Sequence, residues 1–94
     1  LVSGGAHIFG HEIREIFAAF ARGDNARAKE LFVPMYRFCK STGQNGRLLP
    51  NPIMRPAIEL VTGIKLGPAR SPLVPATEEE TEITKAILKE IGKI

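Results

Sequence analysis

The sequence has little cysteine, few aromatic residues and no long apolar run. Its 94 residues include one Cys, no Trp and only 6% aromatic residues. A single Cys39 cannot close an internal disulfide, so nothing indicates a secreted disulfide scaffold, and we expect Cys39 to be a small core residue. No window approaches the ~18 apolar residues of a membrane span, and the opening LVSGGAHIFG lacks the basic region of a secretory signal. We therefore expect a soluble, cytoplasmic protein with no membrane partner.

The sequence also lacks a strong excess of either positive or negative charge. The chain has 13 basic and 10 acidic residues, which give a net charge of +3, and the two signs are interspersed along it. A nucleic-acid-binding protein usually shows a basic stripe or an aromatic stacking platform, and neither is present, so no nucleic-acid partner is expected. The remaining composition, 44% hydrophobic and 24% charged, is typical of one small globular domain.

Candidate metal and cofactor sites are weak. His7 and His11 are four residues apart with Glu12 alongside, but no third ligand follows at a recognisable spacing. The Ser-Gly-Gly stretch from Ser3 to Gly5 lacks the other glycines and the lysine of a phosphate-binding loop. We therefore predict no metal and no cofactor.

Candidate catalytic residues are equally weak. The three glutamates from Glu78 to Glu80 are explained by a role at a helix start. A Schiff-base lysine needs a buried site that lowers its pKa. All six lysines fall on predicted polar faces or in loops: Lys29, Lys40, Lys65, Lys85, Lys89 and Lys93. No catalytic residue is assigned.

Helical periodicity dominates the first half of the chain. Ile13, Ile16, Phe17 and Phe20 recur at i, i+3, i+4 and i+7, which predicts a helix over residues 10–21. Gly23 is a natural C-terminal stop.

A second helix is predicted from Asp24, a favoured N-cap residue, to about Lys40. Pro34 lies inside it and predicts a kink near residues 30–33. The short connection predicts an antiparallel hairpin with the first helix. The predicted buried stripe of the second helix is Ala28, Leu31, Phe32, Met35, Phe38 and Cys39.

Proline and glycine divide the second half. Residues 41–52 form a predicted loop, and Asn51-Pro52 predicts the cap and first position of a third helix that ends at Gly63. This helix would carry Ile53, Ala57, Leu60 and Val61, with an irregular first turn at Pro56.

Residues 64–76 contain three prolines and predict an extended strap, which Leu66, Leu73 and Val74 would hold down. Thr77 and Glu80 then form a predicted capping box that starts the last helix. Ile83, Ile87, Ile91 and Ile94 are spaced as one buried seam.

Taken in order, these pieces resemble the C-terminal portion of the dihydrodipicolinate synthase / N-acetylneuraminate lyase family. The resemblance rests on Asn51-Pro52-Ile53, on the strap Leu73-Val74-Pro75 and on the run from Thr77 to Glu80. Met54 and Arg55 depart from the family pattern, and the loop over residues 41–49 is longer than usual in the family.

The resemblance implies a fold and a domain division. Family members are pyruvate-dependent class I aldolases with a (β/α)8 barrel, which takes about 250 residues, followed by a helical region. Residues 1–23 would be the last strand and helix of the barrel, and residues 24–94 the C-terminal helical region. The isolated chain is expected to be all-α, a small antiparallel bundle of about four helices. Its residues 1–8 would be disordered, drawn into the first helix, or paired as a strand with another copy of the chain.

The resemblance also implies a function. The parent would condense pyruvate, as a lysine-bound Schiff base, with L-aspartate-4-semialdehyde in lysine biosynthesis, and this chain alone would be inactive and structural. No position matches the family's catalytic lysine or tyrosine, so none is carried over; Ser3 and Gly4 would only lie near the barrel's active-site end. The alternatives are another pyruvate aldolase, such as N-acetylneuraminate lyase or 2-keto-3-deoxygluconate aldolase, or a stand-alone helical protein-interaction module. Apolar faces left uncovered predict a homo-oligomer.

Overall fold

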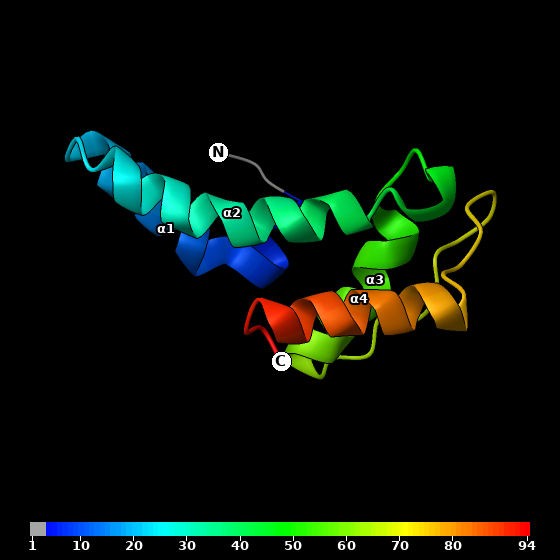
Figure 1. Cartoon of the computed structure of the whole chain (residues 1–94). Helices are drawn as coiled ribbons and strands as arrows, with labels where there is room; N and C mark the ends of the chain where they lie inside the picture. Colours follow the sequence, from blue (N-terminus) through cyan, green and yellow to red (C-terminus); the bar gives the residue numbers. More distant parts are fainter. Residues whose placement is uncertain (1–3) are drawn as a thin grey trace. The chain divides into compact units, whose positions relative to one another are not determined.

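The computed structural model describes residues 4–94, and this part of the chain is all-helical (Figure 1). Four α-helices occur in the order α1 (Ala6–Ala21), α2 (Asn25–Ser41), α3 (Asn51–Thr62) and α4 (Glu78–Glu90). A short 3-10 helix, η1 (Gln44–Gly46), lies in the loop between α2 and α3. Residues 4–94 contain no strand. The prediction of an all-α chain with about four helices is confirmed.

The helix α1 begins earlier than the periodicity predicts. It starts at Ala6 because the Gly5 carbonyl accepts hydrogen bonds from the amides of Ile8 (3.1 Å) and Phe9 (2.8 Å). Phe9 interrupts the helical angles with φ −115° and ψ 22°, so a first turn precedes the predicted helix from Gly10. Ile8 and Phe9 are buried, which anchors this turn. Ala6–Ile8 are therefore drawn into the helix, whereas Leu1–Ser3 lie outside the described residues.

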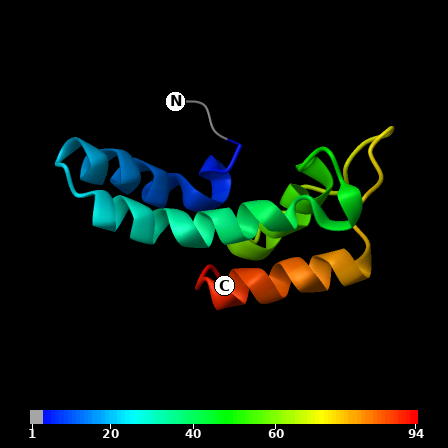
Figure 2. The same ribbon diagram turned by 45° about the horizontal axis from the view of Figure 1, so that its top comes forward.

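The turn between α1 and α2 follows the predicted chemistry. Gly23 adopts φ +78°, and the amide of Asp24 donates 2.8 Å to the Ala19 carbonyl, the pattern of a Schellman motif. The Asp24 carboxylate then accepts from the Arg27 amide at 3.1 Å and caps α2. Figures 1 and 2 show the two helices side by side and antiparallel, as the short connection predicts. The helix α2 continues across Pro34 to Ser41, and a bend at Pro34 stays a prediction.

The chain divides into two compact units, one that ends at Tyr36 and one over Arg37–Ile94. In the second unit α3 and α4 pack on each other. The helix α3 begins at Asn51 with Pro50 as its cap residue and no side-chain cap, so the predicted cap by Asn51 is wrong by one position. Gly63 ends α3 with φ +75°, as predicted. The domain boundary after residue 23 stays a prediction.

The segment over residues 63–77 has no helix and links α3 to α4 as a strap (yellow in Figure 1). Leu73 is half-buried, but Leu66 and Val74 are exposed, so the prediction that these side chains hold the strap is wrong for both. Ala69 is the buried apolar residue of the strap. Polar contacts hold most of the strap instead, because its backbone groups bond to side chains of α3 and of the η1 loop.

The helix α4 has the predicted start and a different buried face. Thr77 accepts from the Glu80 amide at 3.1 Å, and Glu80 accepts from the Thr77 amide at 2.9 Å, which completes the capping box. The predicted isoleucine seam is wrong for Ile83 and Ile94, which are exposed, whereas Ile87 is buried as predicted. The buried face instead combines two polar and two apolar residues: Glu80, Thr84, Ile87 and Leu88.

Candidate functional site

Of the described residues weighed for chemistry from the sequence, Glu80 joins a polar cluster, whereas the two histidines do not. His7 and His11 are exposed on α1. Within residues 4–94, no group of three His, Cys, Asp or Glu side chains could hold a metal ion, and no helix is long and apolar enough to cross a membrane. None of the six lysines is buried. Ser3 lies outside the described residues, and Gly4 lies in a turn.

Cys39 is exposed, so the expectation of a core cysteine is wrong. It lies next to Phe38, which takes the buried position on this turn of α2. Neighbouring atoms partly desolvate the Cys39 thiol and raise its pKa. A raised pKa lowers the thiolate fraction at neutral pH, which disfavours Cys39 as a nucleophile.

The main polar cluster joins Arg47 of the η1 loop to Glu80 of α4. Arg47 donates to both carboxylate oxygens, from Nε to Oε2 at 2.7 Å and from Nη2 to Oε1 at 2.8 Å. The same guanidinium donates to the strap carbonyls of Val74 (2.7 Å) and Pro75 (3.1 Å). Asn45 adds a bond to Glu80 Oε2 at 3.2 Å. One arginine thus ties the loop, the strap and α4 together.

Burial makes this pair strong. The Glu80 side chain is 2% exposed and the Arg47 side chain 15%, so little water competes with their bidentate contact. The Arg47 guanidinium, followed by the Thr77 amide, lowers the pKa of Glu80 far below its usual value, against the opposing effect of burial. The same contact raises the pKa of Arg47. Both carboxylate oxygens are occupied and the group stays ionised, so Glu80 is suited to hold structure and unsuited to donate a proton near neutral pH.

Sequence reasoning found half of this cluster. The Thr77–Glu80 spacing marks Glu80 as a capping residue, but no spacing rule connects it to Arg47, 33 positions away. The local signal that exists is the turn itself: Asn45 takes φ 56° and Gly46 takes φ +73°. Asn and Gly are the residues that tolerate this left-handed region. That turn directs the chain so that Arg47 meets α4.

The bonds from Arg47 form one polar clamp on the strap, at Val74 and Pro75. A second polar clamp holds the other end of the strap. Oε1 of Glu59, on α3, accepts from the amides of Leu66 and Gly67, both at 2.9 Å. These two bonds lower the pKa of Glu59. On the same side, Arg55 Nη1 donates to the Leu66 carbonyl at 3.2 Å. The strap is therefore fixed to α3 through its backbone and not through its apolar side chains.

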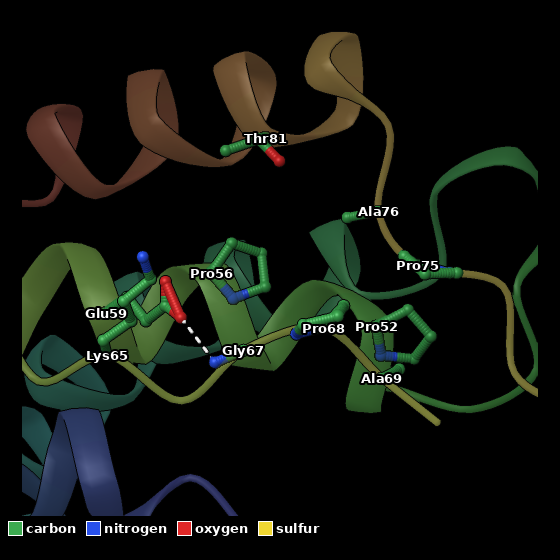
Figure 3. A pocket seen from close by; sticks show the side chains of 10 residues that line it. All are labelled: Pro52, Pro56, Glu59, Lys65, Gly67, Pro68, Ala69, Pro75, Ala76 and Thr81. Atoms are coloured by element: carbon green, nitrogen blue, oxygen red, sulfur yellow. Dashed lines mark hydrogen bonds between the residues drawn. The ribbon is translucent and has the colours of Figure 1, made fainter. Parts of the chain in front are cut away.

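Between this clamp and α4 lies a pocket of about 270 Å³. Figure 3 shows the bond from Gly67 to Glu59 on one side of it and Thr81 of α4 on the other. Its wall is mostly proline and small residues, with Glu59, Lys65 and Thr81 as polar members; the others are Pro52, Pro56, Gly67, Pro68, Ala69, Pro75 and Ala76. No hydrogen bond between two of its three polar side chains occurs in the described part of the chain.

Comparisons with known proteins give consistent relatives. A 4-hydroxy-tetrahydrodipicolinate synthase of Symbiobacterium thermophilum is 36% identical over 95 residues, which cover 98% of this chain and 30% of that protein. The enzyme of the same name in Desulforudis audaxviator is 33% identical, over 96% of this chain and 29% of its own length. An uncharacterized DapA-like lyase of Pyrobaculum arsenaticum is 32% identical, over 96% of this chain and 32% of its own length.

No family model matches the chain. The chain spans about 30% of the length of the curated relatives that it matches. The similarity therefore covers nearly all of this chain and a minor part of each relative.

Proposed function

We propose that this chain, which is related along nearly its whole length to 4-hydroxy-tetrahydrodipicolinate synthases, is the C-terminal helical portion of a lyase of that family. The relatives confirm the resemblance that the sequence predicts. The parent reaction under this proposal condenses pyruvate, held as a lysine Schiff base, with L-aspartate-4-semialdehyde. The similarity of nearly the whole chain to less than a third of each relative carries the proposal.

The role of the segment in the parent is structural. It supplies the last barrel helix and the helical region that braces the barrel wall. Exposed large apolar side chains support this role, since Phe17 and Phe20 on α1 are 57% and 69% exposed. Such residues on neighbouring turns form the kind of apolar surface that a protein normally covers. The two polar clamps keep the strap and α4 in one arrangement while that surface meets the barrel.

The chain by itself is inactive under this proposal. A lysine nucleophile must be partly deprotonated, which burial or a nearby cation achieves, and the exposed and half-buried lysines of this chain support the absence of such a group. Incubation with pyruvate and borohydride, followed by intact-mass spectrometry, tests this directly. We expect no mass shift, with a complete enzyme of the family as the positive control. A trapped pyruvate adduct would overturn the proposal that the nucleophile lies elsewhere.

The encoding gene separates the parent lyase from a stand-alone interaction module. A reading frame that continues upstream for about 200 residues, enough to supply a barrel, supports the lyase. A start codon immediately before Leu1 supports the module, for which the exposed phenylalanines of α1 would form the binding face. The aldehyde substrate is tested separately, by assaying the full-length product of that frame with pyruvate and L-aspartate-4-semialdehyde and with N-acetylneuraminate.

A further inference from the structure

Two arginines of the second compact unit, Arg55 and Arg70, line the same cavity. Of the four arginines in this unit, Arg37 pairs with Glu90 and Arg47 pairs with Glu80. In the described part of the chain, neither Arg55 nor Arg70 forms an ion pair. Both line a cavity of about 230 Å³ between the start of α3 and the strap.

The rest of the cavity wall supplies further donors and no acid. Asn51, at the first position of α3, and Ser71 of the strap also line the cavity, and their side chains carry an amide and a hydroxyl. The other lining residues are Ala69, Pro72 and Leu73. The start of α3 has no side-chain cap and no acidic residue in its first turn, so the positive end of the helix dipole is not neutralised there.

Basic residues outnumber acidic ones in the segment that forms this cavity, although the charge of Arg55 acts on Glu59 and helps to lower the pKa of that carboxyl. Between Ser41 and Ala76 the single acidic residue is Glu59. Its Oε1 accepts from the amides of Leu66 and Gly67, and it lines the other pocket of the unit. Arg55 is held in place by its bond to the Leu66 carbonyl, which leaves the other donors of its guanidinium available.

We propose that this cavity binds a small oxyanion with at least two acceptor oxygens, either phosphate or a short dicarboxylate. A guanidinium presents a planar fork of donors that matches carboxylate and phosphate oxygens. Two such groups, with Asn51 and Ser71 beside them, give the donor set of an anion site. A volume of about 230 Å³ lies below that of typical pockets for drug-sized ligands and suits a ligand of this size.

Inorganic phosphate and malonate are the probes for the two chemistries. Binding to the 94-residue chain is measured by calorimetry at constant ionic strength. The residues whose NMR chemical shifts change on addition of the probe locate the site. We expect one of the probes to bind with saturation and to shift the side-chain Nε–H signals of Arg55 and Arg70. Phosphate binding without malonate binding, or the reverse, identifies which chemistry the site takes. Equal responses to sodium chloride would show general screening and overturn the proposal.

Substitutions make the test specific. Arg70→Gln removes one fork and is expected to weaken the binding of the responding probe by at least about tenfold. Lys65→Gln is the matched control, because it removes one positive charge from the same strap at an exposed position outside this cavity. The affinity of this variant for the responding probe should stay within about twofold of that of the unsubstituted chain. Equal losses in both variants would overturn the site.

Arg70→Lys keeps the charge and guards against misfolding. Without ligand, we expect Arg70→Lys to melt at the same temperature as the unsubstituted 94-residue chain. It should bind the probe more weakly, since an ammonium cannot donate as a planar fork. Unchanged binding in Arg70→Lys and Arg70→Gln together would contradict the proposal. Because this test requires no catalytic activity, its outcome is independent of the proposed lyase relationship.

Discussion

Glu80 takes part in two structures at once. It completes the capping box with Thr77, and it receives the Arg47 guanidinium on both oxygens. A buried carboxylate without a partner is unstable, because desolvation disfavours its charge. Glu80 is tolerated inside this small unit because four donors meet it: two from Arg47, one from Asn45 and the Thr77 amide.

The Arg47–Glu80 contact predicts a specific dependence of stability on pH. The pKa of Glu80 is depressed in the folded state, so its contribution to the free energy of unfolding is fully present above the unfolded-state pKa of about 4.3. This contribution is lost as the pH falls below that value toward the folded-state pKa. Glu80→Gln should lower Tm at pH 7 by about 5–10 °C and flatten the stability profile below pH ~4.5. Thermal unfolding by circular dichroism from pH 7 to pH 3 measures both effects.

Glu90→Gln is the control for this measurement. Glu90 also contacts an arginine, Arg37, at 3.2 Å, but both side chains are more than half exposed. Exposed pairs contribute little to stability, so this variant should melt within about 2 °C of the unsubstituted 94-residue chain. Its stability should fall at acid pH as that of the unsubstituted chain does. A Glu80→Gln profile that matches the Glu90→Gln profile would refute the assigned role of Glu80.

At the scale of the element, α4 depends on its first turn. The Thr77 hydroxyl satisfies the Glu80 amide at 3.1 Å, and loss of a threonine cap costs about 1 kcal/mol. Thr77→Ala should therefore lower the free energy of unfolding by about 1 kcal/mol in urea titrations followed by helical circular dichroism. Thr77→Ser keeps the accepting oxygen and should lose less than half of that. Equal losses in the two variants would assign the effect to the threonine methyl group and not to the cap.

The strap is predicted to depend on Glu59 in the same local way. Glu59→Ala removes the acceptor for the Leu66 and Gly67 amides, so exchange of these two amide hydrogens should become at least about tenfold faster. Hydrogen exchange followed by NMR resolves the two positions. Glu82→Ala, an exposed substitution on α4, should leave both rates unchanged. Slow exchange at Leu66 and Gly67 in Glu59→Ala would show that other contacts hold the strap.

These elements show what a sequence can and cannot predict. Capping, stop and turn signals at Asp24, Gly63 and Thr77 are local, so they place the helix ends within a few residues. The buried face of α4 is not local. Hydrophobic spacing selects Ile87 correctly, but it also selects Ile83 and Ile94, which are exposed. The structure buries the polar Glu80 and Thr84 on this face as well. The reason is that Arg47 and Gln44 reach α4 from a distant loop, and no residue spacing encodes that meeting.

At the scale of the whole molecule, residues 4–94 bury few large apolar side chains for their number. Ile8, Phe9, Phe38, Ile53, Ile87 and Leu88 are the larger members of the buried apolar set. A chain of this size removes only about 60–65% of its unfolded surface from water, so its core is small in any case. In the first unit, five large apolar residues of α1 and α2 remain exposed: Phe17, Phe20, Phe32, Val33 and Tyr36. An exposed apolar surface on this scale favours association.

The isolated chain is therefore predicted to self-associate through α1. Phe17 and Phe20 are three residues apart and lie on neighbouring turns of one helix, so one partner surface can cover both. Sedimentation velocity over a hundredfold concentration range should show the average mass rising above 10.3 kDa. The double variant Phe17→Glu/Phe20→Glu should stay monomeric, because association would bury two charges. Leu48→Glu is the control: Leu48 is 97% exposed in the loop before α3, so this change should leave the association intact.

If the unsubstituted 94-residue chain sediments as a monomer at every concentration, these phenylalanines need no cover from a second copy. Loss of association in Leu48→Glu alone would move the contact surface from α1 to that loop.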